Sequence, residues 1–154
     1  MNTIKYIEGF FFSKLLSKLV NKLCFKGKKF YIEKILYYTF FLLKKKLRYY
    51  SLFIFFEVLE KIKPSIGLKL YKYKRGKKKK INAFPCLLNN SSQYKKSIEW
   101  LTKSIILRKE KKLYIKIYNE LYNTLLNNPT YSLKKKKDYY KYVTLYKTVK
   151  KFKW

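Results

Sequence analysis

Positive charge dominates this sequence and limits how the chain can fold. It contains 39 lysine and arginine residues but only 8 aspartate and glutamate residues, a formal net charge of +31 over 154 residues. A folded chain with this charge repels itself, so its stability depends on anions held close to its surface. Phosphate groups are the usual source of such anions. The sequence therefore predicts a polyanionic partner.

The apolar content shows that the chain nevertheless forms a core. Hydrophobic residues make up 48% of the sequence and aromatic residues 20%, which is too apolar for a disordered basic tail. The length fits one domain, and we predict a single domain over residues 1–154. Many of the abundant residue types have A/T-rich codons, so part of the lysine content reflects codon bias. Acidic residues can also have A/T-rich codons, so the sign of the charge is a functional signal.

Helical spacing of apolar residues recurs along most of the chain. Ser13 is a candidate cap for the first helix, and Gly27 is well placed to end it. Between the third and fourth helical segments, alternating apolar and polar residues lie on both sides of a basic run, a pattern typical of a β-hairpin. The sequence predicts a mostly α fold, a single domain of six helices with one protruding β-hairpin arm. The expected helices cover residues of about 13–26, 30–46, 51–62, 91–108, 110–126 and 133–150, and the hairpin about 66–88.

The residues needed for catalysis or metal binding are scarce. The sequence has no histidine, its eight acids are scattered, and Cys24 and Cys86 are isolated from each other. Zinc sites and redox pairs need clustered cysteine or histidine ligands. We expect no enzymatic activity, no metal site and no cofactor. No run of about 20 apolar residues is present to cross a bilayer, and residues 1–20 lack a secretory cleavage site, so we expect an unprocessed chain.

The basic residues outside the predicted core gather into four groups, most of them at loops or helix ends. The groups are Lys26, Lys28 and Lys29; Lys72, Lys74, Arg75, Lys77, Lys78, Lys79 and Lys80; Lys95, Lys96, Lys103, Arg108, Lys111 and Lys112; and Lys134, Lys135, Lys136 and Lys137. A single lysine run is usually a solvated face. Four runs without compensating acids instead predict phosphate binding, with strong salt dependence and little sequence preference.

Two further features bear on nucleic-acid contact. A hairpin buries little surface against a small helical body, so its basic tip adds little to the stability of the fold. Contact with a partner at a distance from the body explains the tip better. Tyrosines next to the basic groups either stack on exposed bases or pack within the protein. These tyrosines are Tyr71, Tyr73, Tyr94, Tyr114, Tyr139 and Tyr140.

Several short motifs occur in an order and spacing that resemble a known family. They are Asn21-Lys22-Leu23 followed by Lys26-Gly27-Lys28-Lys29; Phe55, Val58, Leu59, Glu60, Ile62, Lys63 and Pro64; Pro85, Trp100 and Leu101; Glu120-Leu121; Lys134, Lys135, Lys136, Asp138 and Lys141; and Lys153-Trp154. From about Phe12 to Trp154 the chain resembles the ribosomal protein S-seven family of the small ribosomal subunit. Arg75-Gly76 is a reduced form of the family's hairpin signature, and residues 1–12 are mostly apolar where the family has a basic arm.

The resemblance implies a helical body bound to small-subunit rRNA in the head (3′ major) domain, where the family supports head assembly. It also implies a hairpin near the mRNA exit and the exit-site tRNA, and neighbouring ribosomal proteins of the head and platform. By this resemblance Lys22, Lys26, Lys28, Lys29 and the Lys134 group contact rRNA. Lys74, Arg75 and Lys77 approach rRNA or tRNA.

Two questions remain open at the level of sequence. The A/T-driven composition and the bacterial-type pattern suggest an organelle ribosome, with a mitochondrion favoured over a relict plastid and an A/T-rich bacterium as a further alternative. The alternative function is a peripheral membrane protein whose basic amphipathic helices bind anionic lipid, suggested by Phe10 to Phe12 and the lysines of the first helix.

Overall fold

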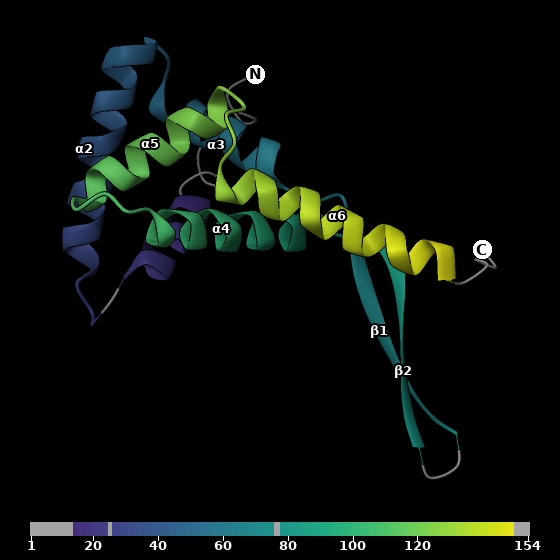
Figure 1. Ribbon diagram of the computed structural model, residues 1–154. Coiled ribbons are helices and arrows are strands. Elements are labelled where there is room, and N and C mark those ends of the chain that lie inside the picture. The colour runs from purple at the N-terminus through teal and green to yellow at the C-terminus, as the bar shows by residue number, and fades with distance from the viewer. Residues whose placement is uncertain (1–13, 25, 76–77, 150–154) are drawn as a thin grey trace, which may run out of the picture.

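The computed structural model describes the backbone of residues 14–24, 26–75 and 78–149, and the side chains of 14–24, 26–69 and 83–145. Helices form a body from which one β-hairpin projects, beside the C-terminal half of the last helix (Figure 1). The mostly α fold with a protruding hairpin is confirmed. The elements are a helix over residues 14–23, α2 (Lys29–Leu47), α3 (Ser51–Ile62), β1 (Ile66–Arg75), β2 (Lys78–Leu87), α4 (Asn90–Leu107), α5 (Leu113–Leu125) and α6 (Tyr131–Val149).

The first helix ends earlier than the sequence predicted, at residue 23 instead of 26. The N–H of Cys24 still donates to the carbonyl of Val20 at 2.9 Å. Beyond it, Lys26 and Gly27 have φ angles of 53° and 74°, in the left-handed region. Two consecutive residues in that region cannot continue a right-handed helix. The expected cap at Ser13 lies outside the described residues.

The two C-terminal helices also begin at other residues than predicted. α6 begins at Tyr131, because the hydroxyl of Thr130 accepts a hydrogen bond from the N–H of Leu133 at 3.4 Å and so acts as its N-cap. α5 begins only at Leu113, since Glu110 is held in the preceding loop. Its carboxylate accepts hydrogen bonds from Arg108 at 3.0 Å and Asn119 at 3.1 Å. The remaining helix and hairpin ends differ from the prediction by one residue or none.

Helix α3 lies at the centre of the body. Its buried residues Ile54, Phe55, Val58, Leu59 and Ile62 recur at spacings of one, three and four, so they cover one broad side of the helix. α3 packs against α2, α4, α5 and α6. It ends before Pro64, which lacks the N–H needed to continue a helix. The core is therefore built around α3.

The hairpin is a two-stranded antiparallel sheet whose register runs from the Ile66–Leu87 pair to the Arg75–Lys78 pair. Ten residues per strand extend over roughly 30 Å. At its base the hydroxyl of Tyr140 in α6 accepts a hydrogen bond from the N–H of Ser65 at 2.9 Å and lies 3.0 Å from the Ser65 Oγ. The arm is thus joined to α6 at one end, where both strands also contact that helix.

Candidate nucleic-acid interface

The structure places most of the predicted lysines of the body on its surface. In the described part of the chain the exposed ones are Lys22, Lys26, Lys28, Lys29, Lys95, Lys103, Lys111, Lys112, Lys134, Lys135 and Lys137, whereas Lys96, Lys136 and Arg108 are partly buried. On the hairpin, Lys72, Lys74 and Arg75 belong to β1 and Lys78, Lys79 and Lys80 to β2. Their side chains, and Lys77 altogether, lie outside the described residues.

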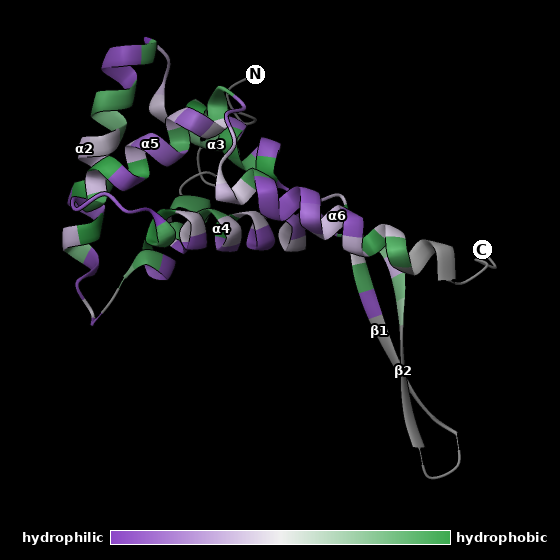
Figure 2. Cartoon of the chain, in the orientation of Figure 1, coloured by the Kyte–Doolittle hydropathy of each residue, from purple (hydrophilic) through white to green (hydrophobic). Residues whose placement is uncertain are grey.

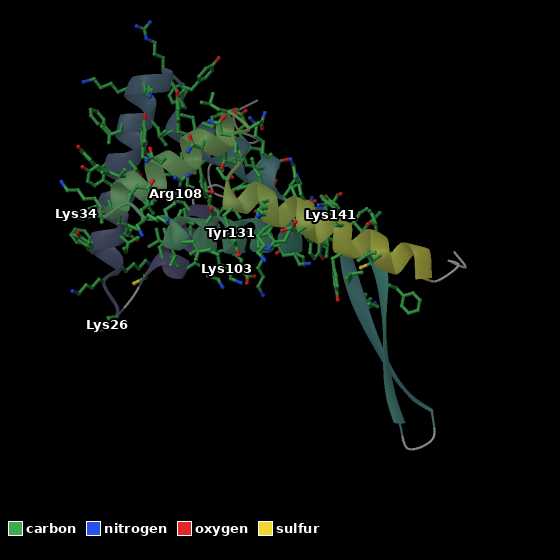
Figure 3. The ribbon with its side chains drawn as sticks, viewed as in Figure 1. Lys26, Lys34, Lys103, Arg108, Tyr131 and Lys141 are labelled. Atoms are coloured by element: carbon green, nitrogen blue, oxygen red, sulfur yellow. The ribbon has the colours of Figure 1, made fainter. Side chains whose placement is uncertain are left out.

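The connector before α2 forms a tight lysine-rich turn. The left-handed conformation at Lys26 and Gly27 reverses the chain, and the N–H of Lys29 donates to the carbonyl of Gly27 at 2.8 Å. Lys26, Lys28 and Lys29 are all exposed around this turn. Figure 3 shows Lys26 at the tip of the connector. Three ammonium groups on so short a turn can neutralise neighbouring phosphates of a nucleic-acid backbone.

The structure brings Lys22 of the first helix together with two predicted lysines of α4. All three lie near Glu99, whose carboxylate is 3.0 Å from the ammonium group of Lys103. The hydrogen bond from Lys103 lowers the pKa of Glu99, with the charges of Lys103, Lys22 and Lys95 adding to the effect and partial burial opposing it. Lys22 and two lysines of the third basic group therefore form one surface, which we call the Glu99 cluster (Lys22, Lys95, Glu99 and Lys103).

Two predicted lysines also hold helices together. Lys136 donates to the carbonyl of Lys61 at the end of α3, at 2.6 Å, and Lys61 donates to the carbonyl of Leu125 at the end of α5, at 2.5 Å. Ammonium groups there satisfy carbonyls that have no partner within the helix. Lys96 donates to the hydroxyl of Tyr139 at 2.5 Å and so joins α4 to α6. The hydrophilic stretch of α6 that contains the Lys134 group is the purple band in Figure 2.

Arg108 has a different environment from the lysines. Its Nε donates to Glu120 at 2.8 Å and its Nη1 to Glu110 at 3.0 Å. Glu120 is only 1% exposed. The pair joins Arg108, at the end of α4, to Glu120 in α5. Removing either partner would leave an uncompensated buried charge, so the pair holds these two helices together. Arg108 thus has a structural role in the body.

Glu120 is the centre of a buried polar cluster that the sequence did not reveal. Besides Arg108, its carboxylate accepts hydrogen bonds from Ser104 at 2.5 Å and Ser132 at 2.8 Å. The Ser132 hydroxyl lies 3.0 Å from that of Thr130, the N-cap of α6. The cluster therefore links α4, α5 and α6. A signal was present in the sequence, since small hydroxyl residues interrupt the apolar stripes of these helices.

A second acid, Glu60 of α3, joins that helix to α4. Glu60 accepts a hydrogen bond from the hydroxyl of Tyr94 and pairs with Lys63 at 2.5 Å. Burial is the largest cause that raises the pKa of Tyr94, and the hydrogen bond to Glu60 and the charge of Glu60 add to it. The pKa of Glu110 is lowered instead, because its own backbone, Asn119 and Arg108 donate hydrogen bonds to its carboxylate. Of the seven acids in the described part of the chain, six pair with a lysine or arginine: Glu33, Glu57, Glu60, Glu99, Glu110 and Glu120.

The tyrosines next to the basic groups mostly pack within the protein. Tyr94 is buried, Tyr139 lies against Trp100 with ring centroids 5.3 Å apart, and Tyr140 binds Ser65. The ring of Tyr114 meets that of Tyr38 edge-on at 5.4 Å. The side chains of Tyr71 and Tyr73 lie outside those described. The packing interpretation is therefore the correct one for these four tyrosines, because each ring has a neighbour in the fold.

The described residues contain no group of three or more histidine, cysteine, aspartate or glutamate side chains that could hold a metal ion. Within the same ranges, every helix is too short or too polar to cross a bilayer. Cys24 and Cys86 are free thiols, each partly buried.

A helical body with exposed lysines at its connectors and helix ends, and with a basic hairpin arm, defines a class of small structural proteins that bind folded RNA. Comparison with known protein families narrows this class to one family. Residues 3–145 match the family model described as "Ribosomal protein S7p/S5e", and the chain belongs to this family. The resemblance identified from the motifs is confirmed, and the family is structural, not enzymatic.

Curated bacterial relatives match over nearly their whole length. The small ribosomal subunit protein uS7 of Mycoplasma capricolum is 29% identical over 142 residues, which cover 92% of this chain and 88% of the relative. The uS7 protein of Pelagibacter ubique is 28% identical over 147 residues, with 96% and 91% covered. That of Wigglesworthia glossinidia brevipalpis is 29% identical over 142 residues, with 92% and 88% covered. These relatives support a ribosomal role over the membrane alternative.

Proposed function

We propose that this protein is a structural constituent of the small ribosomal subunit that binds rRNA in the head (3′ major) domain and supports head assembly. The observation that carries the proposal is the family match over residues 3–145, nearly the whole chain. The exposed lysines of the connector, the Glu99 cluster and the Lys134 group supply the phosphate contacts. Bound RNA then neutralises the charge that would otherwise destabilise the fold.

The hairpin is the proposed contact with the decoding path. It projects from the body and is joined to α6 at its base. We assign its basic residues in both strands and at the tip to rRNA or the exit-site tRNA, near the mRNA exit. Neighbouring proteins of the head and platform complete the proposed surroundings.

A substitution in the connector tests the RNA interface. Replacing Lys26, Lys28 and Lys29 together by Gln should weaken binding to a head-domain rRNA fragment and reduce the slope of log affinity against log salt by about two to three, because each lost phosphate contact removes about 0.9. The measurement is a filter-binding titration at several salt concentrations. Circular dichroism should show unchanged helix content, since all three side chains are exposed.

The matched control removes the same charge elsewhere. Lys44, Lys45 and Lys46 form an exposed run at the end of α2, outside the predicted groups. Changing them together to Gln should leave most of the salt slope intact. Equal losses for both triple variants would show that only net charge matters, and wild-type protein binding a DNA duplex of equal charge as tightly as rRNA would contradict the proposal.

The proposed location is an organelle ribosome, in a mitochondrion ahead of a relict plastid. The bacterial-type relatives support a ribosome of bacterial descent. Quantitative proteomics of small subunits purified from separated organelles and from cytosol should find the chain in the mitochondrial fraction. Recovery with plastid subunits would select the alternative, and a source without organelles would identify an A/T-rich bacterium.

A further inference from the structure

The outer side of α2 exposes aromatic rings where a solvent-facing helix normally carries polar residues. Ile32, Leu36, Phe40 and Leu43 face the core. On the opposite side, Phe30, Tyr37 and Phe41 lie on one stripe, at spacings of seven and four residues, and are 69%, 68% and 63% exposed. We call the wider surface the aromatic face; it consists of Phe30, Tyr31, Tyr37, Tyr38, Phe41, Tyr49, Tyr50, Leu52 and Phe53, all exposed. So many exposed apolar side chains on α2 and the beginning of α3 indicate an interaction site.

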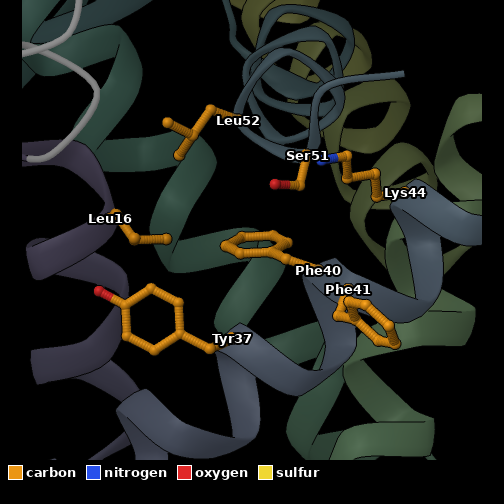
Figure 4. A pocket seen from close by; sticks show the side chains of 7 residues that line it. All are labelled: Leu16, Tyr37, Phe40, Phe41, Lys44, Ser51 and Leu52. Carbon is orange, nitrogen blue, oxygen red and sulfur yellow. The ribbon is translucent and has the colours of Figure 1, made fainter. Parts of the chain in front are cut away.

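An apolar groove opens at the edge of this face. It has a volume of about 420 Å³ and lies between the 14–23 helix, α2 and the beginning of α3 (Figure 4). Leu16 and Leu52 approach it from one side and Tyr37 and Phe41 from the other. The complete lining is Leu16, Tyr37, Phe40, Phe41, Lys44, Ser51 and Leu52. The surface of the groove is therefore mostly apolar.

Positive charge surrounds the groove. Lys34, Lys44 and Lys45 are exposed along the same side of α2. Two of them lie over aromatic rings: Lys34 Nζ is 4.7 Å from the ring centre of Phe30, and Lys44 Nζ is 5.9 Å from that of Tyr50. The one acid of α2, Glu33, pairs with Lys29 at 3.9 Å. The occupant of the groove must therefore be apolar at its centre and acidic around it.

A nucleic acid and an acidic protein segment both meet that charge requirement, but they would place different groups in the groove. A nucleobase carries hydrogen-bonding groups on its edges, and burying them against leucine and phenylalanine side chains leaves them without partners, at a cost in free energy. An apolar protein side chain has no such groups. Aromatic anchors with a charged rim are also typical of protein interfaces, and an amphipathic helix fills an apolar groove with side chains three to four residues apart. These features favour a protein partner over RNA.

We infer that the aromatic face binds an acidic amphipathic segment of a neighbouring protein, with an apolar side chain of that segment in the groove. The placement of this neighbour in the same ribosomal subunit rests on the proposed function. The face lies on α2, the loop after it and the beginning of α3, whereas the proposed RNA contacts lie on the connector, the Glu99 cluster, α6 and the hairpin. The protein would thus present one surface to RNA and another to protein.

A binding assay with defined peptides tests the chemistry of the face. The probe is a fluorescent 18-residue peptide with leucine at helical spacing and glutamate elsewhere, and the comparison is a shuffled peptide of the same composition. The full chain should bind the amphipathic peptide about tenfold more tightly than the shuffled one, because Coulomb attraction is equal and only the first can fill the groove. Equal affinities would overturn the inference.

Substitutions in the groove test where the peptide binds. The double variant Tyr37→Gln and Phe41→Gln keeps the net charge and should remove the tenfold preference. The matched control is Leu107→Gln with Leu126→Gln, which changes two exposed residues that do not line the groove and should keep the preference. If the Tyr37/Phe41 variant instead retains the peptide preference but loses affinity for single-stranded oligouridylate, RNA is the occupant and the inference is wrong.

Crosslinking in the assembled subunit tests the partner itself. A photoreactive benzoylphenylalanine in place of Phe41 should crosslink to an identified neighbouring protein through an acidic amphipathic segment. Crosslinks to rRNA, to residues 1–12 of the same chain, to a second copy, or to nothing would each overturn the inference. The same photoreactive group in place of Lys28 should crosslink to rRNA. Failure at position 28 alone would contradict the proposed function and leave the aromatic face unaffected.

Discussion

The helical body and the hairpin arm are stabilised in different ways. In the body, Phe55, Leu59 and Ile62 of the central helix are fully buried and contact neighbouring helices on several sides. In the arm, each strand pairs with the other, and in the described part of the chain both strands contact α6, where Tyr140 also binds Ser65 at the base of the hairpin. Changes in the body should therefore alter the stability of the whole fold, whereas changes in the arm should act locally.

The same comparison applies to charge. In the body, acids neutralise some of the bases that lie at helix junctions, as Glu120 does for Arg108 and Glu60 for Lys63. The arm sequence from residue 66 to 87 contains seven lysines, one arginine and no acid. A two-stranded sheet alone has little stability in water, and this charge lowers it further. We therefore expect the arm to depend on a bound polyanion more than the body does.

The largest effect is expected from a substitution that breaks the buried Glu120 cluster of the body. Glu120→Ala leaves Arg108, Ser104 and Ser132 without their shared acceptor, and should lower the free energy of unfolding by about 3–5 kcal/mol. Urea denaturation followed by circular dichroism measures this change. As a control, Glu33→Ala removes a partly exposed pair of 3.9 Å and should cost under about 1 kcal/mol. Similar losses for both variants would show that the cluster does not stabilise the body.

A smaller effect is expected at the base of the arm. Gly67 pairs with Cys86, and a Cβ atom at this position would lie 2.4 Å from Cδ2 of Leu88. Gly67→Ala should therefore force Leu88 to move and destabilise the hairpin base by about 1–3 kcal/mol. Hydrogen exchange should be faster for amides of β1 and β2 and unchanged for α3. Adding Leu88→Ala should restore protection of the strands; a loss that persists in the double variant would point to the backbone and not to this contact.

The sequence predicted the elements of both regions because their patterns are local. The range of 51–62 expected from apolar spacing matches α3 residue for residue, and alternation on both sides of the basic run indicated the hairpin. The start of α6 was also readable, since Thr130 precedes it as a capping residue. The prediction missed that cap and began the helix at residue 133, two residues after its first residue in the structure.

The side-chain contacts between helices were not predictable in this way. Arg108 was grouped with RNA-contacting lysines because its charge was visible, whereas its partner Glu120 lies 12 residues away on another helix. Arg108 and Glu120 meet only because α4 packs against α5. The exposed aromatic rings of α2 were missed for the same reason, since only the fold shows which face is left uncovered. The four groups of RNA contacts are still predictions, and the connector variant tests the first of them.

The smallest expected effect concerns the junction between the two regions. Tyr140→Phe removes the hydroxyl that accepts from the Ser65 N–H and meets its Oγ, and should cost about 0.5–1.5 kcal/mol, near the lower end because the site is exposed. Tyr50→Phe, at a tyrosine 77% exposed, controls for the loss of a hydroxyl. In a double-mutant cycle with Ser65→Ala, the two changes should be non-additive, since they remove one contact. The loss should appear as faster hydrogen exchange at residues 65–68 and 86–88 while α3 keeps its protection. Faster exchange throughout α3 would show that the arm and the body unfold as one unit.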